Sequence, residues 1–160
     1  MPTGTEIERK FLLDALPPNL AFARRRPLFQ GYVALDGDTE VRVRRSPSGA
    51  TLTIKHGSGE VRVEEQLELD ARRADALWEL TDGRRVQKVR REMLVDGHTV
   101  EVDEYSGALD GLIVAEVEFD DEDEASAFTP PPWFGREVTG QSGYANRSLS
   151  VHGLPAQDPA

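Results

Sequence analysis

The chain has 160 residues, which suits a single domain, and its formal net charge at pH 7 is -10. This charge disfavours partners that require a positive surface, such as nucleic acid and anionic membranes. The sequence contains no cysteine, which excludes disulfides and thiolate metal sites, and its first thirty residues lack the apolar stretch of a signal peptide. We therefore expect a cytoplasmic protein that binds neither nucleic acid nor membrane.

Most of the chain is expected to form short β-strands, because charged and apolar residues alternate in segments separated by turn residues. The expected strands cover residues 4–13, 29–35, 39–46, 50–56, 61–70, 87–96, 98–105 and 112–120. Turns such as Pro47-Ser48-Gly49 and Asp96-Gly97 are short and suit hairpins. Neighbouring strands should therefore be antiparallel.

Three short helices are expected beside these strands, at residues 70–82, 121–128 and 142–151. Asp70 can cap the first helix, whose apolar stripe includes Leu77 and Trp78 and needs an apolar surface to cover. Residues 155–160 are expected to form a flexible tail after a single domain that covers residues 1–154.

Charges occupy one face of nearly every expected strand. In the first strand, Glu6, Glu8 and Lys10 share one face, while Ile7 and Phe11 point to the other. The same period places these charged residues on the corresponding face of the expected strands: Lys10, Arg42, Arg44, Lys55, Arg62, Lys88, Arg90, Glu6, Glu8, Glu64, Glu101, Asp103, Glu116 and Glu118. A sheet with one face in water also alternates in this way. Like charges two residues apart repel, however, unless opposite charges or bound ions lie near them, so the pattern favours a lined cavity.

Eight such strands can close with either face inward. Burying unpaired charges is heavily penalised, so a charged interior requires a wet tunnel with balanced charges and bound counter-ions. The amphipathic helices favour the arrangement with the charged face inward, because the apolar outer face then gives them a packing surface. The expected fold is α+β, mainly β: a closed eight-stranded antiparallel β-barrel with a charged interior and a few short helices packed outside. Arg9, Arg45 and Arg91 break the apolar outer pattern and are expected at rims or between helices.

The motifs resemble the CYTH superfamily, the triphosphate tunnel metalloenzymes. Glu6-Ile7-Glu8-Arg9-Lys10 is similar to the ExExK signature of that family. Other similar motifs follow in order: Gln30-Gly31-Tyr32, Glu40-Val41-Arg42-Val43-Arg44, Thr53-Ile54-Lys55, Arg62-Val63-Glu64, Lys88-Val89-Arg90, Val102-Asp103, Glu116-Val117-Glu118 and Tyr144-Ala145-Asn146. The resemblance implies an antiparallel tunnel that binds a linear triphosphate and a divalent metal. The short bacterial members that the chain is most similar to are inorganic triphosphatases.

The resemblance implies roles that suit the chemistry of these residue types. The candidate triphosphate-binding residues are Lys10, Arg42, Arg44, Lys55, Arg62, Lys88, Arg90 and Arg147. The candidate catalytic residues are Lys10, Lys55, Tyr32 and Arg90. The candidate ligands for Mg²⁺ or Mn²⁺ are Glu6, Glu8, Glu116, Glu118, Asp103 and Glu64. Guanidinium groups bind phosphate bidentately, and carboxylates are the hard oxygen ligands that these metals prefer.

Structural roles are the alternatives for the same residues. The carboxylates can form salt bridges with tunnel cations, the cations can form a solvated face, and Tyr32 can be a packed aromatic. Glu101 and Asp103 can bind a second metal or hold arginine side chains in place. Three aromatic residues are expected in the core or under helices: Trp78, Trp133 and Phe134. The histidines lack metal-ligand spacing and are expected at the surface: His56, His98 and His152.

Two positions depart from the family pattern. Gln66 stands where relatives often carry a second glutamate after the residue that matches Glu64. Ser142-Gly143 stand where relatives commonly place a basic residue before Tyr144, and Arg147 can compensate from one turn further on. Substrate affinity or tunnel closure is therefore where this chain should differ from its relatives.

The leading functional hypothesis is metal-dependent hydrolysis of inorganic tripolyphosphate to pyrophosphate and phosphate, by a monomer or homodimer. The first alternative is a hydrolase or cyclase that acts on an organic triphosphate, such as a nucleotide or thiamine triphosphate. The second is a non-catalytic polyphosphate-binding module, which would need the cations but could dispense with the acids. The sequence contains none of the common Walker, G-x-S-x-G or H-E-x-x-H motifs, so other hydrolytic chemistries lack support.

Overall fold

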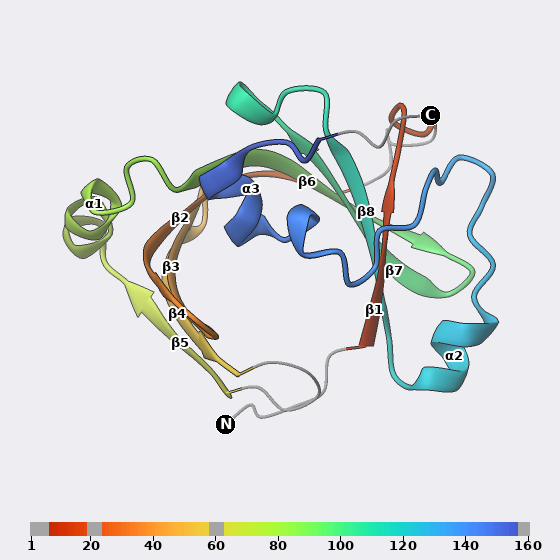
Figure 1. The fold of residues 1–160 in the computed structure, drawn as a ribbon, viewed down its shortest axis with the longest axis horizontal. Coiled ribbons are helices and arrows are strands. Elements are labelled where there is room, and N and C mark those ends of the chain that lie inside the picture. The colour runs from red at the N-terminus through yellow and green to blue at the C-terminus, as the bar shows by residue number, and fades with distance from the viewer. Residues whose placement is uncertain (1–6, 19–23, 58–62, 157–160) are drawn as a thin grey trace.

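The computed structural model describes residues 7–18, 24–57 and 63–156, and these residues form one antiparallel sheet of eight strands. The strands are β1 (Ile7–Leu12), β2 (Arg24–Asp36), β3 (Thr39–Ser46), β4 (Gly49–His56), β5 (Val63–Leu69), β6 (Arg85–Val95), β7 (His98–Tyr105) and β8 (Ile113–Phe119). Their order in the sheet is β1-β8-β7-β6-β2-β3-β4-β5. The sheet curls around a central space, so that its concave face forms an inner wall (Figure 1). The expected antiparallel, mainly β fold is confirmed.

The curled sheet has two ends, β1 and β5. Within the ranges given above, these two strands are not hydrogen-bonded to each other, so the ladder does not run continuously around the tunnel. The expected barrel is therefore confirmed as a curled tunnel wall, whereas closure by strand pairing is not seen.

β2 begins at Arg24, five residues before the expected start at residue 29. Its first part pairs with β6, whereas its pairing with β3 begins only at Phe29. Pro27 lies in this first part, where a missing backbone donor is tolerated because one side of the strand has no partner strand among the described residues. The proline and the polar run before it conceal this part of the strand in the sequence.

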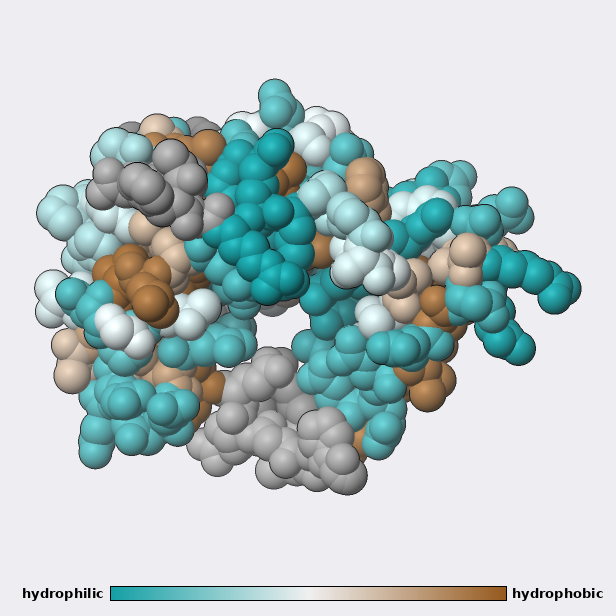
Figure 2. Space-filling model, turned by 180° about the vertical axis from the view of Figure 1, so that it is seen from behind, coloured by the Kyte–Doolittle hydropathy of each residue, from teal (hydrophilic) through white to brown (hydrophobic). Residues whose placement is uncertain are grey.

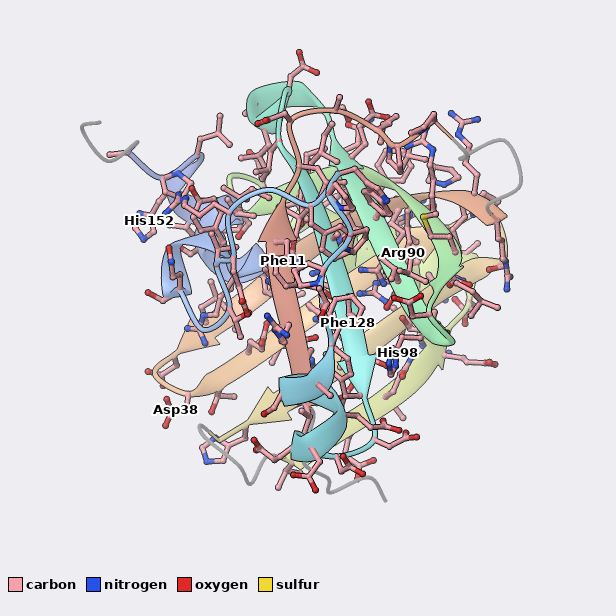
Figure 3. The ribbon with its side chains drawn as sticks, turned by 90° about the vertical axis from the view of Figure 1, so that its right-hand side faces the viewer. Phe11, Asp38, Arg90, His98, Phe128 and His152 are labelled. Atoms are coloured by element: carbon pink, nitrogen blue, oxygen red, sulfur yellow. The ribbon has the colours of Figure 1, made fainter. Side chains whose placement is uncertain are left out.

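Two helices lie on the outer side of the sheet, as expected: α1 (Ala71–Glu79) and α2 (Glu122–Ala127). Asp70 caps α1 by accepting a hydrogen bond from the backbone nitrogen of Arg73 at 2.8 Å. Under α2, the ring of Phe11 from β1 lies 6.5 Å from that of Phe128 in an outer apolar core (Figure 3). That core also buries Phe134, as expected.

The last helix, α3 (Asn146–His152), packs inside the curl of the sheet and corrects the expectation that all helices lie outside (Figure 1). Leu149 of α3 and Tyr144 of the preceding 3₁₀ turn η3 (Ser142–Tyr144) are buried with inward-facing residues such as Val86 and Val114. The inner wall is thus apolar where α3 packs and charged elsewhere. This explains why an amphipathic helix can pack inside the curl of the sheet. A second 3₁₀ turn, η2, covers Gly107–Leu109. No helix within the described ranges is long and apolar enough to cross a membrane.

The three arginines that break the outer apolar pattern all have partners there. Arg9 donates to the backbone oxygens of Ala125 and Phe128, both at 2.9 Å, and pairs with Glu137 at 2.8 Å. Arg45 pairs with Asp75 at 2.9 Å on the same outer side. Arg91 pairs with Glu104 at 3.0 Å. Arg9 and Arg45 therefore connect the sheet to the segments that cover it, whereas Arg91 links the neighbouring strands β6 and β7.

The histidine expectation is correct for two of the three residues. His56 and His152 are exposed. His98 is half-buried, and its ring lies edge-on to Phe119 at 5.0 Å and to Phe128 at 5.7 Å (Figure 3). His98 is thus part of the outer aromatic packing, because the turn that carries it folds back over the core.

Candidate active site

The inner wall encloses a cavity of about 240 Å³ that is lined almost entirely by charged side chains. Six lining residues are cationic: Lys10, Arg42, Arg44, Lys55, Arg90 and Arg147. Six are acidic: Glu8, Glu40, Glu64, Glu101, Glu116 and Glu118. Tyr32, Ala145 and Asn146 complete the wall. The surface view from behind shows hydrophilic residues around a hollow in the middle of the molecule (Figure 2).

Strand pairing explains how distant residues meet in this cavity. Because side chains alternate across a strand, one face of each strand contributes every second residue to the wall. Lys10 of β1 lies opposite Glu116 of β8, and their charged groups are 3.2 Å apart. Lys55 of β4 lies opposite Glu64 of β5, with charged groups 3.9 Å apart. Each of these lysines therefore has a carboxylate neighbour on the adjacent strand.

Acidic residues concentrate on the side of the cavity formed by β1, β8 and β7. Glu8 lies directly opposite Glu118, and Glu101 lies directly opposite Glu116. Burial raises the pKa of Glu101, the nearby carboxylates raise it further, and Arg90 opposes them. Like charges at directly opposed positions are destabilising unless a cation lies between them. Carboxylate oxygens are the ligands that a hard divalent metal prefers, but among the described residues no three of these groups lie close enough together to hold one.

Asp103 and Lys88 lie behind the cavity wall in a buried ion network. The Nζ atom of Lys88 is 2.8 Å from Oδ2 of Asp103, and both side chains are almost completely buried. Arg90 donates to both oxygens of Asp103, at 2.8 Å and 2.9 Å, and its Nη1 atom lies 2.7 Å from Glu101. Burial alone would raise the pKa of Asp103, but Lys88 and Arg90 together hold it well below its usual range. Asp103 thus holds Arg90, which itself lines the cavity.

A second buried network lies on the neighbouring strands β2 and β3. Gln30 is completely buried, and its side-chain oxygen accepts from Nε and Nη2 of Arg44 at 3.1 Å and 3.0 Å. Its side-chain nitrogen donates to the hydroxyl of Tyr32 at 2.8 Å. Burial raises the pKa of Tyr32 to about 12. Burial, with Arg42 and Arg90 nearby, lowers the pKa of Arg44 to about 10.

Most residues expected at the site share this one cavity. The expected residues on the wall are Glu8, Lys10, Tyr32, Arg42, Arg44, Lys55, Glu64, Arg90, Glu116, Glu118 and Arg147. Lys88 and Asp103 are close to it but face each other behind the wall. Glu6 and Arg62 lie outside the described residues, so their expected roles remain predictions.

Three residues at or beside the site stand in the motifs quoted above, but the sequence analysis gave them no role. Glu40 lies two residues before Arg42 on the same strand face, so the alternation of side chains could have predicted that it lines the cavity. Asn146 reaches the wall because α3 enters the tunnel, and its side-chain oxygen accepts from the hydroxyl of Tyr105. Gln30 is neutral and buried, and no charge pattern marks it.

The comparisons with known proteins agree with this geometry. The family model described as the CYTH domain matches residues 4–150. The chain belongs to the CYTH domain family. A protein of Nitrosomonas europaea named inorganic triphosphatase is 42% identical over 149 residues, which cover 92% of this chain and 97% of the relative.

A second relative and a solved structure carry the same description. An inorganic triphosphatase of Acetivibrio thermocellus is 37% identical over 148 residues, which cover 91% of this chain and 93% of the relative. The crystal structure of an inorganic triphosphatase superposes with a TM-score of 0.76 at 39% identity, and covers 94% of this chain and 97% of that one. The family and the tunnel fold are thus established along nearly the whole chain.

The two departures from the CYTH pattern occupy different parts of the molecule. Gln66 lines a neighbouring cavity of about 340 Å³ that shares Arg44 with the first. At the other departure, Arg136 donates to the Tyr144 hydroxyl at 3.2 Å, so a cation reaches this tyrosine from another segment. Arg147 lines the charged cavity and donates to the backbone oxygen of Gly37 at 3.0 Å. It thus connects α3 to the turn between β2 and β3.

Proposed function

We propose that this single-domain protein hydrolyses inorganic tripolyphosphate to pyrophosphate and phosphate, with a divalent metal as cofactor. The observation that carries the proposal is the charge arrangement of the 240 Å³ cavity, where six cations and six acids face one another around a single space. The names of the relatives support it, because proteins similar along nearly their whole lengths are called inorganic triphosphatases. At the level of substrate class, these names support a small polyphosphate as the substrate.

The cationic residues suit a linear chain of phosphoryl groups. Tripolyphosphate carries roughly four to five negative charges near neutral pH, judged from phosphate ionisation near pKa 6. Arg42 and Arg44 come from the same face of β3 and present planar forks that bind phosphate oxygens bidentately. Lys10 and Lys55 approach from other strands as point charges. Phosphate binding from several strands would hold the chain in line for attack by water.

The acidic residues suit a metal beside that chain. Glu8, Glu116 and Glu118 are the residues that we propose as ligands for Mg²⁺ or Mn²⁺. Such a metal, when bound, stabilises charge on the leaving phosphate and helps to orient water. The non-catalytic alternative does not require these carboxylates, and their presence opposite one another favours an enzyme.

Tripolyphosphate should be preferred over ATP by about 10-fold or more in kcat/KM, because the wall offers charge along its length but no stacking surface for a base. Among the described lining residues Tyr32 alone is aromatic, and this residue is only 1% exposed. Phosphate release should be measured with tripolyphosphate, pyrophosphate and ATP at equal metal concentration, and again with excess EDTA. Pyrophosphate should be a poor substrate, and EDTA should abolish release from all three.

Three results would contradict the proposal. Faster cleavage of ATP or thiamine triphosphate than of tripolyphosphate would replace the inorganic substrate with an organic one. Formation of cyclic AMP from ATP would indicate a cyclase. Tight tripolyphosphate binding without any phosphate release would indicate the binding module.

A further inference from the structure

We propose that Gln30 is a positioning residue that makes the Tyr32 hydroxyl a hydrogen-bond donor to the cavity and fixes the Arg44 guanidinium beside it. The inference rests on the proposed function, since it assigns a role toward a phosphate in the same cavity. Gln30 itself does not line the cavity and has no exposed surface. Its effect must therefore pass through its two neighbours.

The orientation of the Gln30 amide follows from its partners. A guanidinium group has only donors, so the atom of Gln30 that receives two bonds from Arg44 must be the carbonyl oxygen. Rotation of the amide by a half turn would place its NH₂ group against those donors. The nitrogen is therefore on the side of Tyr32, at 2.8 Å from the phenol oxygen.

This arrangement decides the direction of the tyrosine proton. Because the Gln30 nitrogen donates to the phenol oxygen, the proton of Tyr32 points elsewhere. Arg42 lies directly opposite Tyr32 on β3, and its guanidinium group has no acceptor to offer. Tyr32 lines the cavity, so an acceptor there, such as a phosphate oxygen, is the partner that the geometry leaves. Burial raises the pKa of Tyr32 to about 12, so the proton is present at neutral pH.

The neutrality of Gln30 matters for Arg44. A carboxylate at this position could accept the same two hydrogen bonds, but it would also neutralise the guanidinium and weaken its attraction for phosphate. It would in addition accept the Tyr32 proton and turn that donor away from the cavity. A glutamine therefore serves both neighbours, whereas an isosteric acid would oppose both.

The substitution Gln30→Glu tests both effects with little change in shape. We expect kcat for tripolyphosphate to fall about 10-fold or more, as one directed donor is lost, and Kd to rise about 10-fold through Arg44. Tyr32→Phe should lower kcat by a similar factor. When Tyr32→Phe is already present, adding Gln30→Glu should change kcat less than about twofold while still weakening binding. The kcat readout thus separates the tyrosine effect from the Arg44 effect.

Gln87→Glu is the matched control, because Gln87 lies on β6 directly opposite Phe29, is exposed and does not line the cavity. It should leave kcat and Kd unchanged. Gln30→Met, which removes both the donor and the acceptor, should show the same dependence on Tyr32 and keeps the test open if Gln30→Glu does not fold. Thermal unfolding checks that each variant is folded.

Calorimetry with tripolyphosphate in EDTA, which measures binding, and phosphate release with Mn²⁺, which measures cleavage, together separate this inference from the proposed function. If the wild-type protein neither binds nor cleaves tripolyphosphate, the proposed function fails, and this inference fails with it. If the wild-type protein binds and cleaves it, but the kcat effects at the two positions multiply independently, only the positioning role is overturned. Wild-type kinetics in folded Gln30→Glu would overturn it in the same way.

Discussion

Glu8→Gln is expected to lower kcat for tripolyphosphate by about 100-fold or more, because a ligand of the proposed metal loses its charge. Glu8 lies directly opposite Glu118 on the neighbouring strand, and both line the cavity. The substitution keeps the size of the side chain, so the variant should still fold, and the loss of turnover can be separated from unfolding. Phosphate release at several Mn²⁺ concentrations, with thermal unfolding in EDTA, measures both effects.

Glu65→Gln is the control for this prediction, because Glu65 stands beside Glu64 on β5 but is exposed and does not line the cavity. It should leave kcat unchanged. If Glu8→Gln retained normal turnover and normal metal dependence, Glu8 would have no part in metal binding, and the acidic side of the cavity would be structural.

Asp103→Asn should lower the free energy of unfolding by about 3 to 5 kcal/mol, because it leaves the buried ammonium of Lys88 without its anionic partner. It should also reduce activity, since Arg90 loses the carboxylate that holds it at the cavity wall. Urea unfolding followed by circular dichroism measures the first effect. Glu104→Gln on the same strand removes an outer pair with Arg91, in which Glu104 is 40% exposed, and should have a much smaller effect.

The difference in unfolding free energy between wild type and Asp103→Asn should depend on pH in a definite direction. Since the pKa of Asp103 in the folded protein lies below its unfolded value of about 3.9, its stabilising effect is complete above that pH and is lost as the pH falls further. The stability gap between wild type and Asp103→Asn should therefore be constant near neutrality and narrow below about pH 4. A gap that vanished already at pH 6, or an Asp103→Asn protein as stable as wild type, would contradict the buried network.

Much of the fold could be predicted from the sequence because alternation of charged and apolar residues has a direct structural meaning in a strand. It identified all eight strands and correctly placed the charged face inward. It could not find the first part of β2, where the arginines before Pro27 give no alternation. It also could not place α3, because an amphipathic helix fits an apolar surface on either side of a sheet. Only the packing of Leu149 against the inner wall decides this.

The same alternation predicted most residues of the cavity wall. It could not predict which inward-facing side chains line the cavity and which are buried behind them. Lys88 and Arg90 share a strand face, yet the first is sealed behind the wall and the second lines it. Lys88 and Arg90 are two residues apart on one strand, so the sequence predicts the same direction for both side chains. Their different positions depend on Asp103, which pairs with both of them. Gln30 shows the opposite limit, since a neutral side chain can organise a charged site without any charge pattern to reveal it.

The central claim is that the triphosphate lies on the inner face of the sheet, and two arginines of β3 that point to opposite faces test it directly. Arg42 lines the cavity, whereas Arg45 on the same strand points outward to Asp75 and Trp78. Calorimetric titration with tripolyphosphate should show Arg42→Ala binding about 10- to 100-fold more weakly than wild type, and Arg42→Lys recovering part of the loss. Arg45→Ala should bind as wild type does. Wild-type affinity in Arg42→Ala, or an equal loss in Arg45→Ala, would contradict binding in the tunnel.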